Sequence, residues 1–492
     1  MTCDKPSTLE RMSKIPDRAA GTQGHDLPKG EALANFMTKS WADSALENVK
    51  PAEVVKFAAL RRSQIGALYP GVRLVFPAGT FKVRSNDTDY KFRADSAFAY
   101  LTGISASDCV PDSVLVLEPS NKGHHSYLYI HPRSPRDTSE FHSDRRHGEF
   151  WIGRRLSSAE TESRYGLSVR HIDTLPELAE NQIGTLVLRN NDAIVNSLFE
   201  KHKKREAKLL SDVAELRLIK DKYEIAELQK AVDITARGFN DMIRSFPAAT
   251  SVRRGERIVE SAFYGRARLE GNDLGYDTIA AAGAHACVLH WIKNDGDVRP
   301  GDLILIDAGV EVDSMYTADI TRTLPINGKF SPEQLTIYTL VYEAQRAGIA
   351  AVKPGAPWNA FHDAAMEVIA QGLEKLGVLP GTAAESLDPE AGFHRRWTVH
   401  STGHMLGIDV HDCAAARRES YYDGELQEGM VLTVEPGIYI QPDDLMFPPE
   451  YRGIGVRIED DVLVTKSGAK VLSKSIPSHP HEVEVWMANL LR

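Results

Sequence analysis

Acidic side chains stand inside apolar, β-prone sequence in the second half of the chain. Asp307 and Asp319 each lie among Leu, Ile, Val and Thr residues. Residues 303–310 and 315–324 are typical of strands, with a turn near Asp313 between them. In such a hairpin the two aspartates lie opposite each other on one face, with Cβ atoms about 5 Å apart. Like charges at that separation repel unless a cation lies between them, and the alternative is two acids that face solvent.

Four further stretches of the same region place ionisable side chains where strands or tight turns are expected. They carry His290, His400, His404, His411, Glu435, Arg457 and Glu459. A single buried carboxylate is more often part of an ion pair than a ligand, but the whole set changes that balance. Two aspartates and two glutamates supply four negative charges, which is enough for two divalent cations. The predicted metal ligands are Asp307, Asp319, His404, Glu435 and Glu459.

The donor set indicates which metal is expected. Oxygen donors with one imidazole and no thiolate favour Mn²⁺, or Co²⁺ or Fe²⁺ in its place, over structural zinc. The spacing of His400 and His404 is that of an HExxH zinc helix, but Ser401 and the flanking glycines argue against that helix. In a strand over residues 456–464, Arg457 faces the same way as Glu459. We therefore expect Arg457 to hydrogen-bond the ligand carboxylates, and the alternative is an exposed charge.

Length and composition exclude several classes of protein. A chain of 492 residues is too long for one core and predicts two domains with extensions. The net charge of -10 argues against nucleic acid or an anionic membrane as partner, because both select basic patches. No apolar run approaches the roughly 20 residues that span a bilayer, and the first residues lack a signal peptide's pattern, so we expect a cytoplasmic location. Four scattered cysteines predict reduced thiols.

The chain divides by pattern into four parts. Residues 1–50 predict a partly disordered extension with one short helix near residues 33–37. Residues 51–205 alternate short apolar strands with helices and predict a small α/β domain, which a charged connector follows. Residues 215–475 predict an α+β domain whose antiparallel sheet holds the site on one face, with helices on the other. Residues 476–492 form a C-terminal tail.

Three helices are predicted in the α+β domain. Apolar residues recur on one face from Ile225 to Phe246, and Pro247 is expected to end that helix. A second helix begins after Ser331 as its N-cap. A third runs from about residue 358 to residue 376 and stops at a glycine.

The residues from His400 to Asp412 fit the signature of the proline peptidases. The order Asp, Asp, His, Glu, Glu over residues 215–475 resembles the metallopeptidases of the pita-bread fold, namely methionine aminopeptidase, prolidase and aminopeptidase P. This resemblance implies that the five acidic and imidazole residues named above are the ligands of a dinuclear metal centre. It also implies that three histidines line the substrate pocket and steady the reacting carbonyl; these are His290, His400 and His411.

Residues 89–103 resemble the creatinase-like N-terminal domain of aminopeptidase P, which favours that branch of the family. The resemblance implies that a metal-bridging hydroxide hydrolyses the bond before a proline at the second position of a peptide, with Glu435 as ligand and proton acceptor. It also implies a homodimer or homotetramer. Asp307 and Asp319 are one residue further apart than the family's aspartates usually are. We therefore predict one extra residue in the hairpin, as a longer turn or a bulge.

Three alternatives remain beside this interpretation. The first is prolidase, which uses the same metals and accepts only Xaa-Pro dipeptides. The second is a catalytically inactive, peptide-binding homologue, and the third is a creatinase-like hydrolase that needs no metal. Retention of all five predicted metal ligands argues against the second and the third.

Overall fold

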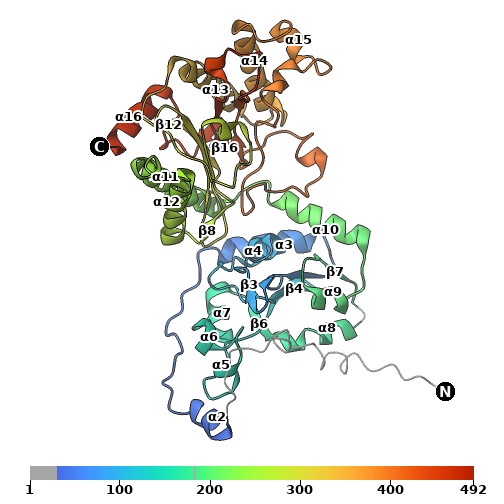
Figure 1. The fold of residues 1–492 in the computed structure, drawn as a ribbon. Coiled ribbons are helices and arrows are strands. Elements are labelled where there is room, and N and C mark those ends of the chain that lie inside the picture. Colours follow the sequence, from blue (N-terminus) through green and yellow to red (C-terminus); the bar gives the residue numbers. More distant parts are fainter. Residues whose placement is uncertain (1–29, 182, 492) are drawn as a thin grey trace, which may run out of the picture.

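The chain folds into an N-terminal and a C-terminal domain, joined through helix α10 (Lys203–Leu216) (Figure 1). A computed structural model describes residues 30–181 and 183–491. The disorder expected of the first residues therefore lies largely outside the described residues. Within this part of the chain, no helix is long and apolar enough to cross a membrane.

A mixed five-stranded sheet forms the centre of the N-terminal domain. The strands of this domain are β1 (Arg73–Pro77), β2 (Val83–Ser85), β3 (Thr88–Asp89), β4 (Val114–Ser120), β5 (Gly123–Ile130), β6 (Ser168–His171) and β7 (Thr185–Val187). Their order in the sheet is β6-β5-β4-β1-β7, and β2 and β3 form a separate hairpin. β1 pairs antiparallel with β4 and parallel with β7, and all five of its residues are buried, which explains the apolar run that follows Arg73.

Short helices surround this sheet. They are α2 (Glu31–Met37), α3 (Val55–Ala67), α4 (Ser96–Thr102), α5 (Glu140–Ser143), α6 (Glu149–Ile152), α7 (Ser158–Tyr165), η1 (Ile172–Thr174), α8 (Glu177–Glu180) and α9 (Ala193–Leu198). Asp95 caps α4 by accepting hydrogen bonds from the backbone N–H groups of Ala97 and Phe98. Helix α2 forms where a short helix was predicted, but it buries none of its residues and leaves Phe36 74% exposed. It therefore does not pack against the body.

Long helices flank the sheets of the C-terminal domain (Figure 1). They are α11 (Lys222–Ala249), α12 (Gly255–Glu270), α13 (Pro332–Ala351), α14 (Ala360–Lys375), α15 (Ala383–Leu387) and α16 (Pro480–Leu490), with 3₁₀ helices η2 (Gly283–Cys287), η3 (Phe393–Arg396), η4 (Arg418–Ser420) and η5 (Pro449–Tyr451). The predicted N-cap is confirmed, because Ser331 and Gln334 form a capping box at the start of α13. α16 lies within the predicted tail and buries Val483 and Met487.

One helix boundary was predicted wrongly. α11 continues through Pro247 to Ala249. A proline this close to the C-terminal end removes only one intrahelical hydrogen bond, and the chain beyond Ala249 turns at once toward α12.

The predicted single sheet of the C-terminal domain is several small antiparallel sheets. Its strands are β8 (Asp273–Leu274), β9 (Ile279–Ala282), β10 (Leu303–Ala308), β11 (Val310–Glu311), β12 (Ile320–Pro325), β13 (Val431–Val434), β14 (Gly437–Tyr439), β15 (Gly455–Arg457), β16 (Asp460–Thr465) and β17 (Gly468–Val471). They pair as β12-β10-β9, β13-β16-β17, β11-β8 and β14-β15. The predicted strand over 456–464 is therefore broken: β15 pairs with β14, and β16 pairs with β13. The break places Glu459 between two strands that belong to different sheets.

Candidate metal centre

The β10–β12 hairpin places both aspartates on one face. Asp307 and Asp319 were predicted to lie directly opposite each other. Instead, Asp307 pairs with Thr321, and Asp319 lies two residues away from that position on the opposing side of the hairpin. The reason is the turn, which holds residues 313–315 and carries Met315 in the left-handed conformation at φ 67°. Relative to the family, the extra residue stays a prediction; the turn itself holds three residues. It shifts the hairpin centre by one residue and leaves the two side chains facing the same side.

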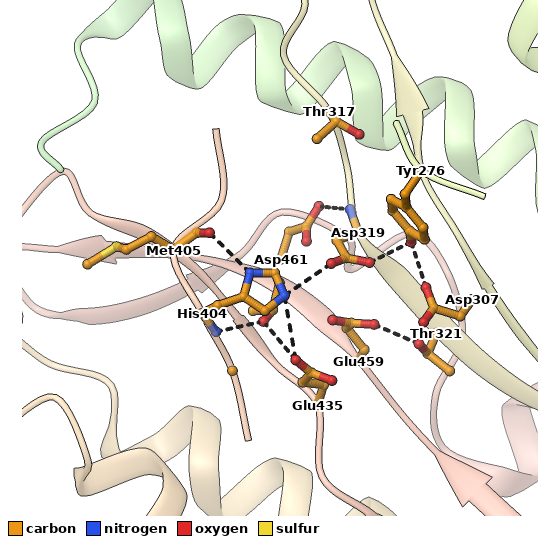
Figure 2. Close-up of polar contacts among 12 residues, drawn as sticks. Tyr276, Asp307, Thr317, Asp319, Thr321, His404, Met405, Glu435, Glu459 and Asp461 are labelled. Carbon is orange, nitrogen blue, oxygen red and sulfur yellow. Dashed lines mark hydrogen bonds and ion pairs between the residues drawn. The ribbon is translucent and has the colours of Figure 1, made fainter. Parts of the chain in front are cut away.

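All five predicted ligands line one cavity of about 740 Å³; they are Asp307, Asp319, His404, Glu435 and Glu459. Figure 2 shows them converging on one point. Asp307 comes from β10, Asp319 and Glu435 from residues next to β12 and β13, Glu459 from the link between β15 and β16, and His404 from a loop. His404 Nε2 lies 3.3 Å from Asp319 Oδ2 and 3.6 Å from Glu435 Oε1. Its Nδ1 lies 3.1 Å from the backbone oxygen of Met405, which fixes Nδ1 as the protonated nitrogen. Nε2 is then the nitrogen that points at the carboxylates and can bind a cation.

Two buried carboxylate oxygens in this cluster lack the partners that burial demands. Glu459 Oε2 accepts a hydrogen bond of 2.6 Å from Thr321 Oγ1, but Glu459 Oε1 has no hydrogen-bond partner among the described residues. The same holds for Asp461 Oδ1, although Asp461 Oδ2 accepts from the backbone N–H of Asp319 at 3.2 Å. Ligand atoms of Asp319, His404 and Glu459 all lie within 4.8 Å of one another. The donors therefore fit divalent cations, which would neutralise the charges and satisfy the free oxygens.

The electrostatics of the protein without cations agree with this fit. Burial, opposed by Arg457 and reinforced by Asp319, raises the pKa of Asp307. Burial raises the pKa of Glu435 to about 7 despite the opposing charge of His404. Burial and the neighbouring carboxylates raise the pKa of Glu459 well above its usual value. Burial opposes the charged form of His404, but the hydrogen bond to Asp319 raises its pKa to about 9. The raised pKa of each group means that protons compete with a cation for these side chains.

Arg457 makes the contact expected of it. It is 4% exposed, and its Nη2 donates to Asp307 Oδ2 at 2.5 Å. Its Nε donates to Thr321 Oγ1 at 3.1 Å, and its Nη1 to the hydroxyl of Tyr439 at 3.1 Å. The guanidinium is thus buried behind the cluster and fixes the orientation of Asp307.

The three predicted pocket histidines line the same cavity; they are His290, His400 and His411. His400 Nε2 lies 2.7 Å from the hydroxyl of Tyr439, and burial lowers the pKa of His400 to about 4, so its imidazole is neutral. The rings of His404 and His411 meet edge to face at 4.3 Å, and burial lowers the pKa of His411 as well. Neutral imidazoles of this kind can donate or accept a hydrogen bond at a substrate carbonyl.

The N-terminal domain holds the loop that carries His411. Arg93 Nη2 donates to the backbone oxygen of Ile408 at 2.7 Å, and Ser96 Oγ donates to Asp409 Oδ1 at 2.5 Å. Arg217, at the end of α10, donates to Asp409 Oδ2 at 2.7 Å. Both domains therefore determine the shape of this wall of the cavity.

Tyr276 was missed by the sequence reasoning. Its hydroxyl lies 2.6 Å from Asp307 Oδ1 and 2.5 Å from Asp319 Oδ1, so one phenol bridges the two aspartates (Figure 2). Burial and the two carboxylates raise the pKa of Tyr276 well above its usual value, which keeps the hydroxyl protonated. It stands in a short segment between β8 and β9, where no periodicity marks it.

Glu256, on α12, was missed as well. Its carboxylate is fully buried and accepts four hydrogen bonds: from the backbone N–H groups of Ala282 (2.8 Å) and Gly296 (2.6 Å), from His285 Nδ1 (2.8 Å) and from Trp291 Nε1 (2.8 Å). Two of these donors precede His290 in the chain and two follow it, so Glu256 holds both sides of the loop that carries His290. The only signal in the sequence is an acid on the apolar face of a helix, which is also the pattern of a structural ion pair.

Comparison with known proteins identifies the family. Residues 226–466 match the model of metallopeptidase family M24, and residues 57–187 match that of the aminopeptidase P N-terminal domain. Xaa-Pro aminopeptidase 1 of Streptomyces coelicolor is 51% identical over 463 residues, which cover 94% of this chain and 92% of that protein. Xaa-Pro aminopeptidase of Escherichia coli is 34% identical over 457 residues, which cover 88% of this chain and 97% of that protein.

Solved structures of similar proteins share the architecture. Aminopeptidase PepP of Pseudomonas aeruginosa superposes with a TM-score of 0.76 at 31% identity, covering 90% of this chain and 99% of that one. A variant of Escherichia coli aminopeptidase P in complex with substrate gives a TM-score of 0.77 at 31% identity, with the same coverage. The predicted two-domain fold, with a pita-bread domain after a smaller N-terminal domain, is confirmed. The chain belongs to metallopeptidase family M24, in its group of Xaa-Pro aminopeptidases.

Proposed function

We propose that this protein is a metal-dependent aminopeptidase that releases the N-terminal residue from peptides with proline at the second position. The observation that carries the proposal is the convergence of two aspartates, two glutamates and one imidazole in one cavity, with a buried glutamate oxygen that has no partner among residues 30–181 and 183–491. The relatives named Xaa-Pro aminopeptidase support the substrate class, since one of them aligns with 94% of the chain.

Two divalent cations would be held in this cavity by Asp307, Asp319, His404, Glu435 and Glu459. When bound, they would supply the Lewis acidity that lowers the pKa of water and polarises a peptide carbonyl. Manganese is the cation of this proposal, because the donors are mostly oxygen with one imidazole and no thiolate. Arg457 and Tyr276 are positioning residues here, since each holds a ligand aspartate through a hydrogen bond of 2.5–2.6 Å.

Glu435 is the proposed proton carrier of the reaction. Its carboxylate lies at the cavity wall, 3.6 Å from His404 Nε2 and 3.7 Å from His400 Nδ1. It would accept the proton of the attacking water and pass it to the nitrogen of the leaving proline. That nitrogen needs a proton because it leaves as a neutral amine and an unprotonated amide nitrogen is a poor leaving group.

The pocket histidines would stabilise the oxyanion that forms on the scissile carbonyl. His290, His400 and His411 lie on the same cavity as Glu435. A positioned donor of this kind typically contributes about 3 kcal/mol to the transition state. Tyr439 lies between His400 and Arg457 and so orients the imidazole.

Prolidase is the alternative that the comparisons do not favour, because the similar proteins are named aminopeptidases. The test is peptide length: purified protein is offered Xaa-Pro and Xaa-Pro-Yaa at equal concentration, and the released residue is identified by mass spectrometry. Cleavage of the tripeptide to Xaa and Pro-Yaa supports the proposal. Cleavage of the dipeptide alone would replace it with a dipeptidase.

The proposal extends to location and assembly. The described cysteines (Cys109, Cys287 and Cys413) are free thiols, which fits the reducing cytoplasm. We place the enzyme there as a dimer or tetramer of identical chains. Light scattering of the purified protein measures the assembly directly.

A further inference from the structure

A second cluster of ligand-type side chains lies in the N-terminal domain. Ligand atoms of His131, Asp144 and His147 all lie within 4.8 Å of one another. His131 follows β5, and the other two lie in the turn between α5 and α6. Figure 1 places α5 and α6 in the lower domain, away from β12 and β16 at the metal centre. The cluster is therefore separate from the site described above.

The side chains of the cluster are in direct contact with one another. The rings of His131 and His147 lie with their centroids 4.1 Å apart. His147 Nδ1 is 3.2 Å from Asp144 Oδ2, and Glu140 forms a short contact with His131 Nε2. A carboxylate in the position of Glu140 either orients a ligating imidazole or supplies a fourth ligand.

The backbone around the cluster is fixed by the half-buried guanidinium of Arg155. Arg155 Nη1 donates to the backbone oxygen of His131 at 2.7 Å, and Arg155 Nη2 donates to that of His147 at 2.9 Å. Asp144 Oδ1 accepts from the backbone N–H groups of Arg146 at 2.7 Å and His147 at 2.9 Å. Residues distant in sequence are thus held together before any ligand binds, which lowers the entropic cost of binding.

The donor types of the cluster favour a transition-metal cation. Two imidazoles with carboxylates are the donors that Zn²⁺ and similar transition-metal ions select, whereas the catalytic cluster is mainly oxygen.

We propose that His131, Asp144 and His147, assisted by Glu140, bind one further divalent cation of the zinc class. This ion would fasten the end of β5 to the turn between α5 and α6. The alternative is that the same residues form two histidine–carboxylate pairs without metal. The number of zinc ions bound per chain distinguishes a metal site from such pairs.

The segment that this ion would fasten also contacts the residues that precede α3. Arg133 Nη1 donates to the backbone oxygen of Ser44 at 3.2 Å, and Arg136 Nη1 donates to that of Ala42 at 3.3 Å. The rings of Trp41 and Phe141 meet edge to face at 5.1 Å. Binding of the ion would therefore stabilise the conformation of residues 41–44 as well as that of the segment itself. The proposed role of the site is structural.

The test measures zinc bound to the chelator-stripped full-length chain by equilibrium dialysis and elemental analysis. Wild type is compared with Asp144→Asn and His147→Asn, which should each bind one zinc ion fewer per chain. Asp144→Asn is the milder change, because the amide oxygen can still accept the two backbone hydrogen bonds and preserve the turn. His125→Asn, an exposed histidine of β5, is the matched control and should bind as much zinc as wild type.

A further variant separates this site from the proposed catalytic centre. His404→Ala removes a catalytic ligand and should still hold the zinc ion that His147→Asn loses. Circular dichroism reports whether each variant is folded. Equal zinc content in wild type, Asp144→Asn and His147→Asn would overturn the proposal, and it would do so whether or not the protein cleaves peptides.

Discussion

Replacing Glu459 by glutamine separates the cost of the buried charges from the benefit of the cations. Glu459 is 1% exposed, and its Oε1 has no hydrogen-bond partner in the described part of the chain. Glutamine has nearly the same shape and keeps the oxygen that accepts from Thr321. In metal-free protein the change removes a repulsive charge, so the variant should be more stable than wild type. In metal-loaded protein it removes a ligand, so the order should reverse.

The magnitude follows from the spacing of the charges. Ligand atoms of Glu459 and Asp319 lie within 4.8 Å, a distance at which two full charges repel by about 3 kcal/mol at an effective permittivity of about 20. Partial protonation of Glu459 in wild type relieves part of this repulsion. We expect the free energy of unfolding of the metal-free variant to exceed that of wild type by about 1–3 kcal/mol at pH 8.

The pH dependence has a definite sign. Burial and the surrounding carboxylates raise the pKa of Glu459 in the folded protein above its unfolded value of about 4.3. Metal-free wild type therefore loses stability as the pH rises above that unfolded value, because the folded state binds more protons there. The glutamine variant lacks this loss. Its advantage should be absent near pH 4 and should grow towards pH 8.

The assay is urea unfolding with chelator and with Mn²⁺, for wild type, Glu459→Gln and the exposed control Glu428→Gln. At a free Mn²⁺ concentration of about 100 times the dissociation constant, wild type should gain about 2.7 kcal/mol. The control should behave as wild type, and Glu459→Gln should gain much less. A variant that is less stable than wild type in chelator at pH 8, or that gains as much from Mn²⁺, would refute the reasoning.

Three further substitutions test individual roles at the site. Glu435→Gln should abolish turnover because the proton carrier is lost, and near-normal activity of the metal-loaded variant in a peptidase assay would contradict its role. Tyr276→Phe removes the phenol that bridges Asp307 and Asp319, so Mn²⁺ affinity measured by calorimetry should fall about 10- to 100-fold; an unchanged affinity would mean that the bridge is incidental. Glu256→Gln places an amide N–H group against N–H donors that need an acceptor, so the loop of His290 should shift. As a result, kcat/KM should fall at least about 10-fold, while metal content should stay constant. An unchanged kcat/KM would show that the loop is held by other contacts.

Local sequence signals predicted the parts of the fold that local contacts determine. Ser331 followed by Pro332 marks the start of α13, and the capping box there forms within one turn of the chain. Gly377, with φ 70°, follows the end of α14 because glycine adopts that conformation without steric cost. Side chains alternate along a strand, so Asp319 shares a face with Thr321, which lies opposite Asp307.

Tertiary contacts determine what the sequence did not predict. The register of Asp307 against Asp319 depends on a turn that is centred one residue later than predicted. The break between β15 and β16 follows from pairing with two different partner strands. Tyr276 contacts Asp307, which lies 31 residues away in the sequence, and Glu256 contacts His285, which lies 29 residues away. A single sequence shows no pattern that joins these partners.

The most direct test of the central claim uses an Xaa-Pro-Yaa tripeptide, with Xaa-Ala-Yaa as the control peptide. Protein stripped of metal by a chelator is assayed before and after addition of Mn²⁺, and release of the N-terminal residue is followed. The account predicts no cleavage before addition and Mn²⁺-dependent cleavage of the proline peptide alone afterwards. Equal cleavage of both peptides, or cleavage that persists without metal, would contradict it.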